Sequence, residues 1–190
     1  ETLSRIVDYS DRTSCVLFGD GAGAAVIRAT CDSTHAIIDV NVGADGEYQD
    51  FLITPASGSR NPLTPELLAQ KEHFLKMKGN ETFKVAVRTL TNDVKEILEH
   101  SHLTINHVTH FIPHQANHRI ISAVGDAIGV TPSQLVLTVH KYGNTSAASI
   151  PMAMNDIYEE GHLKKGDLML LDAFGGGLTW GSALVPFNGE

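Results

Sequence analysis

The chain has 190 residues, 42% of them hydrophobic, which is enough to bury one substantial core. Its formal net charge of −8 argues against non-specific binding to nucleic acid, because no basic stretch offsets the acidic excess. No apolar run reaches the length of a membrane span, and two cysteines are too few for a disulfide framework, so we expect a cytoplasmic protein.

The first patterned segment, Cys15–Ile27, predicts a strand, a glycine-rich turn and a second strand. The apolar run Cys15–Phe18 precedes the turn Gly19–Gly23, and Ala24–Ile27 follows it. The sequence begins at Glu1 without a methionine or a signal-like segment, and its first strand has no partner upstream. We therefore expect that an N-terminal part of the protein precedes this sequence.

The next part of the chain predicts a strand, a loop and two helices. The strand is expected over Ile37–Val42, a loop rich in Ser, Asn and Pro over Ala56–Pro65, and a helix over Pro65–Lys78. Asn80 can N-cap a longer helix whose apolar residues recur on one face. These residues are Phe83, Val87, Leu90, Val94, Ile97 and Leu98.

Two apolar β-like runs, Val108–Ile112 and Leu135–Val139, each lead into a helical pattern. The first helix ends at Gly129, and a short turn of helix is expected at Thr131–Ser133. The apolar face of that first helix consists of Ile120, Ile121, Val124 and Ile128.

The last third of the chain predicts one more helix and a hairpin. Pro151 should bend this helix or lie in its first turns, and Gly161 should stop it. Leu168–Val185 then repeats the pattern of strand, glycine turn and strand, with its turn at Gly175–Gly177. Two such hairpins, one near each end, indicate a duplicated architecture. The alternation of strands and helices predicts a layered α/β domain.

The most distinctive polar residues are His114 and Asn144, each at a point where a predicted strand gives way to a helix. Side chains and free backbone N–H groups can converge on a ligand there, and the helix dipole favours negative charge. A neutral imidazole donor beside an amide donor suits a thioester oxygen that becomes an enolate. Neither Cys15 nor Cys31 has the surroundings of an activated nucleophile, so we expect the chain to hold half of an enzyme.

Two other kinds of site are disfavoured. A G-x-G-x-x-A spacing begins at Gly19, but the segment after it continues as a predicted strand, whereas a dinucleotide site needs a helix there. His114 and His118 have the spacing of a zinc-protease helix, but Gln115 stands where that motif needs its glutamate. We therefore expect no metal site.

The triple glycine Gly175–Gly177 has two interpretations. It could be a flexible turn, or it could present a backbone N–H directly to an oxyanion, because glycine lacks a Cβ. Asp172, in the preceding strand, is expected to face a buried polar partner rather than a substrate.

Four motifs occur in order along the chain: Phe18–Ala24, His114–Asn117, Gly143–Ser149 and Ala173–Ser182. Together they closely resemble the β-ketoacyl-ACP synthase III family, the initiating condensing enzymes of type II fatty acid synthesis in the thiolase superfamily. The resemblance implies a thiolase-like, five-layered αβαβα fold built from two similar halves. Residues 1–33 would be the end of the first half, and residues 34–190 would be the complete second half.

The resemblance also implies a reaction, the decarboxylative Claisen condensation of an acyl-CoA starter with malonyl-ACP. A cysteine in the absent first half would accept the acyl group. His114 and Asn144 would donate to the malonyl thioester oxygen, and the N–H of Gly176 would form an oxyanion hole with that of the cysteine. No cofactor would be needed besides the CoA thioester and malonyl-ACP, which are substrates.

Further roles implied by the resemblance concern binding. The pantetheine tunnel would be lined by Asn80, Phe83, Ala116 and Phe174. Arg12 would lie beside the CoA adenine, and Arg119 would dock acyl carrier protein.

The sequence departs from the family pattern in two places. Leu178 stands where members often have an aromatic residue. Farther along the same predicted helix, after Arg119, Asp126 and Ala127 stand where basic residues are common in the family. Docking of an acidic carrier protein depends on charge complementarity, so the second departure weakens the inference of the usual carrier protein.

Two alternatives stay open. A related starter-unit ketosynthase or acyltransferase of polyketide or secondary metabolism shares these motifs. A non-catalytic, condensing-enzyme-like scaffold would share the fold, although a scaffold has no need of the paired donors His114 and Asn144. The expected assembly is a homodimer that binds neither nucleic acid nor membrane.

Overall fold

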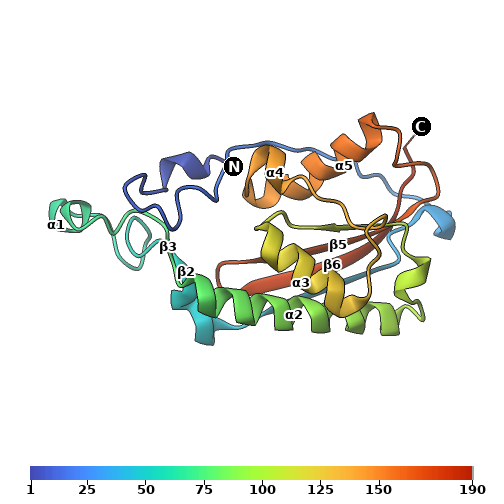
Figure 1. Cartoon of the computed structure of the whole chain (residues 1–190), viewed down its shortest axis with the longest axis horizontal. Helices are drawn as coiled ribbons and strands as arrows, with labels where there is room; N and C mark the ends of the chain where they lie inside the picture. Colours follow the sequence, from blue (N-terminus) through green and yellow to red (C-terminus); the bar gives the residue numbers. More distant parts are fainter. Residues whose placement is uncertain (190) are drawn as a thin grey trace.

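A computed structural model describes residues 1–189 and shows a four-stranded mixed sheet with helices on both faces (Figure 1). The strand order is β1-β6-β5-β4. Strands β5 (Leu168–Gly175) and β6 (Thr179–Pro186) form the predicted C-terminal hairpin, which confirms that prediction. Strand β1 (Asp39–Ala44) is antiparallel to β6, and β4 (His110–Pro113) is parallel to β5.

Helices cover the sheet on two sides, which confirms the predicted layered α/β arrangement. Helices α2 (Gly79–His100) and α3 (His118–Ile128) lie on one face, with Phe111 and Leu170 in the core beneath them. Helices α4 (Val139–Tyr142) and α5 (Ser149–Glu159) lie on the other face (Figure 1). Among residues 1–189, no helix is both long and apolar enough to cross a membrane.

Helix α2 has the amphipathic face that the sequence predicts. Leu90, Val94, Ile97 and Leu98 are buried, and the other predicted residues pack against this cluster. Its predicted start is wrong by two residues. The N-cap is Lys78, and Asn80 lies inside the first turn.

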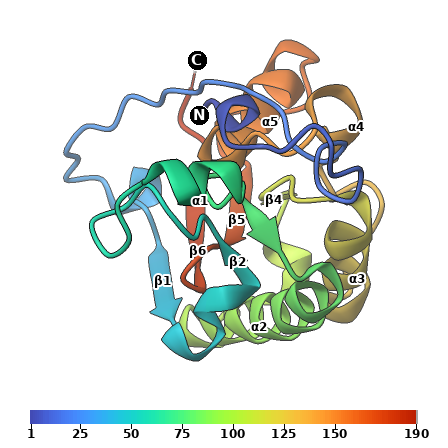
Figure 2. The same cartoon turned by 90° about the vertical axis from the view of Figure 1, so that its left-hand side faces the viewer.

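The helix predicted over Pro65–Lys78 is wrong for most of its length. Only α1 (Pro65–Ala69) forms, because Lys71 adopts a left-handed φ of 61° that a helix cannot continue through. The later residues form β3 (Lys76–Met77), which pairs with β2 (Leu52–Ile53) (Figure 2). Short 3-10 helices complete the described chain at Leu3–Arg5, Ser33–His35, Gly46–Phe51, Ile105–His107 and Ser146–Ala148.

Helices α3 and α5 agree with most of the sequence signals. Gly129 ends α3 with a left-handed φ of 79°, and Pro151 lies in the first turn of α5. Between these helices the agreement is poorer. Pro132–Gln134 is a turn without helix, and Leu135 forms a single bridge to Phe111 in place of a full strand.

The predicted N-terminal hairpin over residues 15–27 is wrong. Phe18 forms an isolated bridge to Asn144, and the residues after Gly21 are irregular and exposed, with no described strand beside them. The backbone at Gly21 and Gly23 lies against α5, where a Cβ would come within 2.6 Å of Met152 Sδ and 2.3 Å of Pro151. The alternate glycines therefore permit close packing on a helix and do not form a turn.

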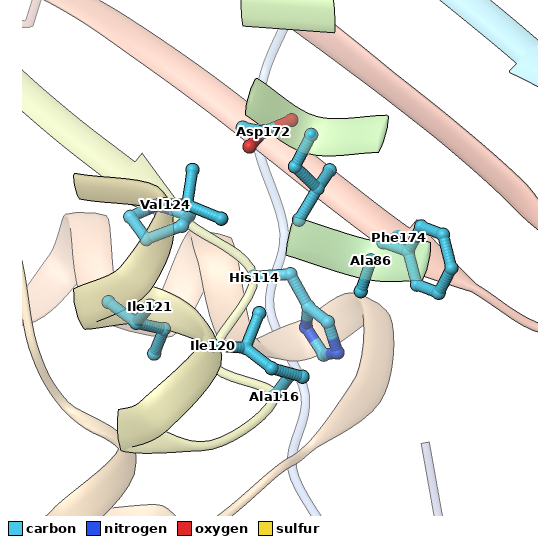
Figure 3. A pocket seen from close by; sticks show the side chains of 10 residues that line it. Ala86, His114, Ala116, Ile120, Ile121, Val124, Asp172 and Phe174 are labelled. Atoms are coloured by element: carbon cyan, nitrogen blue, oxygen red, sulfur yellow. The ribbon is translucent and has the colours of Figure 1, made fainter. Parts of the chain in front are cut away.

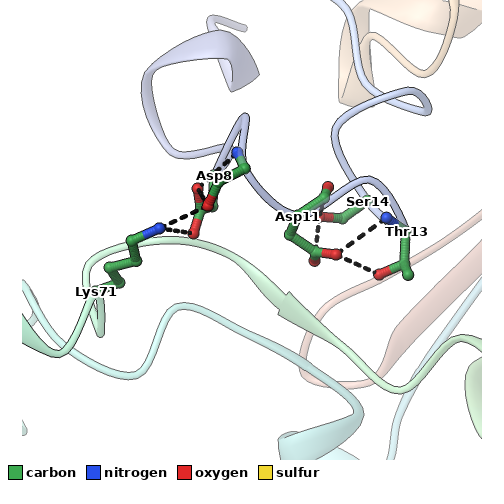
Figure 4. A network of polar contacts seen from close by, with 6 residues as sticks. Asp8, Asp11, Thr13, Ser14 and Lys71 are labelled. Carbon is green, nitrogen blue, oxygen red and sulfur yellow. Dashed lines mark hydrogen bonds and ion pairs between the residues drawn. The ribbon is translucent and has the colours of Figure 1, made fainter.

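The N-terminal segment is also joined to the loop after α1 by polar contacts (Figure 4). Lys71 Nζ lies 2.9 Å from Asp8 Oδ2 and 2.6 Å from Ser10 Oγ. The hydrogen bond from Lys71 lowers the pKa of Asp8 well below its usual value. The carboxylate of Asp11 accepts hydrogen bonds from the N–H and hydroxyl of Thr13, so this loop is held by its own side chains.

Candidate active site

His114 and Asn144 line the same pocket, which has a volume of about 490 Å³. His114 comes directly after β4, in the link to α3, and Asn144 lies between α4 and α5. The sequence prediction that these two residues share one site is therefore consistent with their positions. Other residues of the wall include Leu17, Phe18, Leu52, Phe174, Gly176 and Trp180.

The backbone holds His114 at the point where the chain leaves the sheet. Its N–H donates to the carbonyl of Asp172 at 2.7 Å, which extends the pairing of β4 with β5 by one residue. Its carbonyl accepts the N–H of Ala116 at 2.8 Å, so the chain turns at once. Asn117 then N-caps α3 through its side-chain oxygen and the N–H of Ile120.

The environment of the His114 ring keeps it uncharged at neutral pH. Burial lowers the pKa of His114 to about 4, and a backbone hydrogen bond with Ser146 opposes this only in part. The Nδ1 atom lies 2.6 Å from the hydroxyl oxygen of Ser149. A neutral imidazole at this position can donate one hydrogen bond without adding a charge.

Asn144 is fixed through both its backbone and its side chain. Its N–H donates to the carbonyl of Leu17 and its carbonyl accepts the N–H of Gly19, each at 2.8 Å. Its Oδ1 accepts the N–H of Ser146 at 2.9 Å. The side-chain amide N–H groups have no partner among the described residues, so they are free to donate to a ligand in the pocket.

The turn after Asn144 contains backbone strain. Ser146 has a φ of 53°, a left-handed conformation that is unfavourable for serine. This conformation accompanies the hydrogen bond that orients the Asn144 amide, and the same turn leads to Ser149 beside His114. Strain of this kind, held by surrounding contacts, is a frequent feature of functional sites.

A second, smaller cavity of about 20 Å³ lies behind His114, and Figure 3 shows the side chains around it. Its wall is apolar except for His114 and Asp172. Asp172 is 1% exposed, and neither carboxylate oxygen has a hydrogen-bond partner among the described residues. Burial, with the nearby charge of Asp93, raises the pKa of Asp172 well above its usual value. The buried location of Asp172 matches the prediction, but its side chain has no hydrogen-bonded polar partner.

The structure brings some of the other predicted site residues to the main pocket and leaves others outside it. Gly176, Ala116 and Phe174 line the pocket with His114 and Asn144. Gly176 directly follows β5. A Cβ added at this position would lie 3.2 Å from the carbonyl oxygen of Leu52, so the backbones of Gly176 and Leu52 lie close together.

Four predicted binding residues lie outside the pocket wall. Arg12 is exposed between Asp11 and Thr13 in the N-terminal segment, and Asn80 is exposed at the start of α2. The guanidinium of Arg119 lies over the ring of Phe83, 5.1 Å from its centroid. Arg119 is exposed and is next to Ile120, which lines the pocket, so it lies near the rim.

Sequence reasoning missed the supporting role of Gln115. Its Nε2 donates to the carbonyls of Pro113 and Val136, and its Oε1 accepts from the N–H groups of Thr138 and Val139. Its buried amide thus joins the His114 loop to the start of α4. The position of Gln115 beside His114 was a signal, but Val136, Thr138 and Val139 are 21 to 24 residues away, too distant for a local pattern to reveal.

Residues 1–189 contain no group of three His, Cys, Asp or Glu side chains arranged to hold a metal ion. His118 is exposed, and its Nδ1 lies 3.4 Å from Ser122 Oγ on the surface of α3. Cys15 and Cys31 are free thiols, and neither lines the pocket.

Comparison with known proteins shows one family along the chain. Residues 1–46 match the model described as 3-oxoacyl-[acyl-carrier-protein (ACP)] synthase III, and residues 98–187 match that of its C-terminal part. The whole chain is 62% identical to a beta-ketoacyl-[acyl-carrier-protein] synthase III of Sulfurovum sp. (strain NBC37-1) and covers 56% of that protein. The chain therefore spans a little over half the length of this relative.

Solved structures show the same relationship. The synthase III of Aquifex aeolicus VF5 is 40% identical to this chain and has a TM-score of 0.84. The match covers 97% of this chain and 55% of the Aquifex chain. The synthase III of Pseudomonas aeruginosa PAO1 is 34% identical to this chain and has a TM-score of 0.89. The match covers 99% of this chain and 57% of the Pseudomonas chain. These matches confirm the predicted thiolase-like α/β fold class.

Proposed function

The chain belongs to the 3-oxoacyl-[acyl-carrier-protein] synthase III family, and on this premise we propose that it carries the decarboxylation and condensation part of that enzyme's site. The observation that carries the proposal is the shared pocket of His114 and Asn144, one a neutral imidazole and the other an amide with free N–H groups. The reaction proposed is condensation of an acyl-CoA starter with malonyl-ACP, which initiates fatty acid synthesis.

The chemistry suits two neutral donors. When malonyl thioester loses CO2, the electrons of the broken C–C bond move onto the thioester carbonyl and give an enolate. Donors from His114 and Asn144 stabilise the charge on that oxygen. The enolate carbon then attacks the carbonyl of the acyl-cysteine thioester, the C–S bond breaks, and the cysteine thiolate leaves. Because the pKa of His114 is about 4, the ring does not protonate the carbanion at neutral pH.

The remaining site roles belong to the same proposal. The N–H of Gly176 would contribute to the oxyanion hole for acyl transfer to a cysteine outside this sequence. Ala116 and Phe174 would contact pantetheine inside the pocket, a role supported by their place on its wall. Asn80 and Phe83 would contact pantetheine nearer the surface, and Arg12 would contact the CoA adenine.

The proposed partners are acyl-CoA, acyl carrier protein and a second copy of the protein. Arg119 would dock the carrier protein at the rim. We further propose a cytoplasmic location, no cofactor, and no binding to nucleic acid or membrane. Residues 1–33 would belong to the first thiolase-like half and residues 34–190 to the second.

The test uses a full-length protein that contains this sequence, either native or made by fusion to the remaining part of the Sulfurovum relative. With acetyl-CoA and malonyl-ACP it should release CO2 and form acetoacetyl-ACP. The isolated chain should do neither and should not be labelled by radioactive acetyl-CoA, because its cysteines do not line the pocket. A full-length protein that is acylated but never condenses with any carrier protein would refute the proposal. Condensation with a polyketide carrier protein alone would favour a starter-unit ketosynthase.

A further inference from the structure

The hydroxyl of Ser149 lies between two groups of the His114 loop. Its oxygen is 2.6 Å from Nδ1 of His114 and 3.1 Å from the backbone nitrogen of Gln115. Ser149 is 2% exposed and is the first residue of α5. Because α5 is anchored through the buried side chains of Ala153 and Ile157, this hydroxyl is held in a fixed place beside the ring.

The direction of these hydrogen bonds follows from counting protons. The N–H of Gln115 can only donate, so the oxygen of Ser149 accepts from it. The hydroxyl has a single proton of its own, and the one acceptor to which it is hydrogen-bonded among the described residues is Nδ1 of His114. If the ring proton were on Nδ1, the buried Ser149 proton would have no acceptor, which is unfavourable.

We infer that Ser149 holds His114 in the tautomer with the proton on Nε2, so that this nitrogen is a hydrogen-bond donor toward the pocket. Ser149 does not line the pocket and does not meet a substrate there, so it is a positioning residue. Fixing the tautomer of an imidazole through its other nitrogen is an established way to set its catalytic role. For the thioester chemistry, this inference rests on the proposed function.

Nitrogen-15 NMR of the ring in the full-length protein tests the inference without reference to catalysis. Protonated and unprotonated ring nitrogens have well-separated resonances, and a His114→Gln variant identifies the signals of His114. At neutral pH we expect a protonated Nε2 and an unprotonated Nδ1. A proton on Nδ1 in the unmodified protein would overturn the inference even if the enzyme condenses malonyl-ACP normally.

Three variants connect the tautomer to activity. Ser149→Ala should give a mixture of tautomers and lower kcat for condensation about tenfold, equivalent to about 1.4 kcal/mol, while the rate of acyl transfer from acyl-CoA stays unchanged. Ser149→Thr keeps the hydroxyl and should restore both properties. Ser122→Ala is the matched control, since Ser122 contacts Nδ1 of the exposed His118 at 3.4 Å.

The outcomes separate the inference from the proposed function. An unchanged, pure Nε2–H spectrum in Ser149→Ala would overturn the role of Ser149 whatever the activity. The expected tautomer change in a protein that never condenses malonyl-ACP would leave the role of Ser149 standing and refute the proposed function.

Discussion

The side-chain oxygen of Gln115 accepts a hydrogen bond of 2.8 Å from the backbone N–H of Thr138, which ties the His114 loop to the segment that leads to Asn144. Gln115 is 1% exposed, so water cannot replace its bonds. The spacing between His114 and Asn144 therefore depends on the side chain of Gln115, which is hydrogen-bonded to neither side chain.

Gln115→Leu should strongly destabilise the protein. The substitution leaves the N–H groups of Thr138 and Val139 without their acceptor, and each buried unsatisfied group costs about 1–3 kcal/mol. Urea unfolding should show a loss of at least about 2 kcal/mol. Gln49→Leu, at an exposed position, is the control and should change stability by less than about 0.5 kcal/mol. Equal stability of the two variants would contradict this role of Gln115.

His114→Ala and Asn144→Ala should each lower malonyl decarboxylation and condensation about 10²–10³-fold in the full-length protein, because each removes one donor to the developing oxyanion. Acyl transfer from acyl-CoA should be spared, since it depends on backbone donors. Stopped-time assays of CO2 release and of acyl-enzyme formation measure the two steps separately. His162→Ala and Asn188→Ala, at exposed positions outside the pocket wall, are the controls. Near-normal condensation by either site variant would refute its role.

Acidification should destabilise the folded protein through His114. Its pKa falls from 6.5 to about 4 in the fold, so between these values the unfolded chain binds more protons than the folded one. Stability should therefore decrease as pH falls through 6.5 toward 4, by up to about 3 kcal/mol. A His114→Gln variant should lose this part of the pH dependence. Urea titrations of both proteins at pH 7 and pH 5 measure it, and parallel changes in stability would contradict the prediction.

Asp172→Asn should stabilise the protein at neutral pH. A carboxyl whose pKa is raised by folding lowers stability as pH rises above the unfolded value of 3.8, because ionisation is easier in the unfolded chain. The amide has nearly the same shape and no charge, so a gain of about 1–3 kcal/mol is expected. Asp126→Asn, at an exposed position of α3, is the control. A destabilised Asp172→Asn protein would show that the carboxylate has a partner outside the described residues.

Arg119→Glu should raise KM for malonyl-ACP more than KM for acyl-CoA, because only the carrier protein presents an extended acidic surface. The effect should shrink with added salt, since exposed charges are screened over about 8–10 Å near physiological ionic strength. Lys165→Glu is the control, as it precedes β5 at the end opposite to the pocket. Identical carrier-protein kinetics of the two variants at low salt would argue against docking at Arg119.

The sequence was informative where structure depends on neighbouring residues. The hairpin of β5 and β6 and the buried face of α2 could be predicted because their apolar residues recur at regular spacings within a short stretch of sequence. The N-terminal hairpin was wrong because Phe18 pairs with Asn144, far along the chain, and an apolar run does not specify its partner. The left-handed Lys71 that ends α1 gave no signal, since lysine is an ordinary helix residue.

The same limit applies to the site. His114 and Asn144 stood out because of their places between strand and helix, and both do line the pocket. The contact of Ser149 with His114 joins residues 35 positions apart, so no helical or strand period contains it. Burial, which sets the pKa of His114, is likewise a property of the assembled layers.

The alternation of glycines against α5 also constrains how the chain can change in length. Gly21 and Gly23 face the helix because successive residues of an extended segment point to opposite sides. An insertion of one residue just before Gly21 would put the inserted side chain in the place of Gly21, against Met152, and the side chain of Ala22 in the place of Gly23, against Pro151. A change of two residues would restore the glycines to the helix, so this segment should tolerate length differences in even steps better than in odd ones.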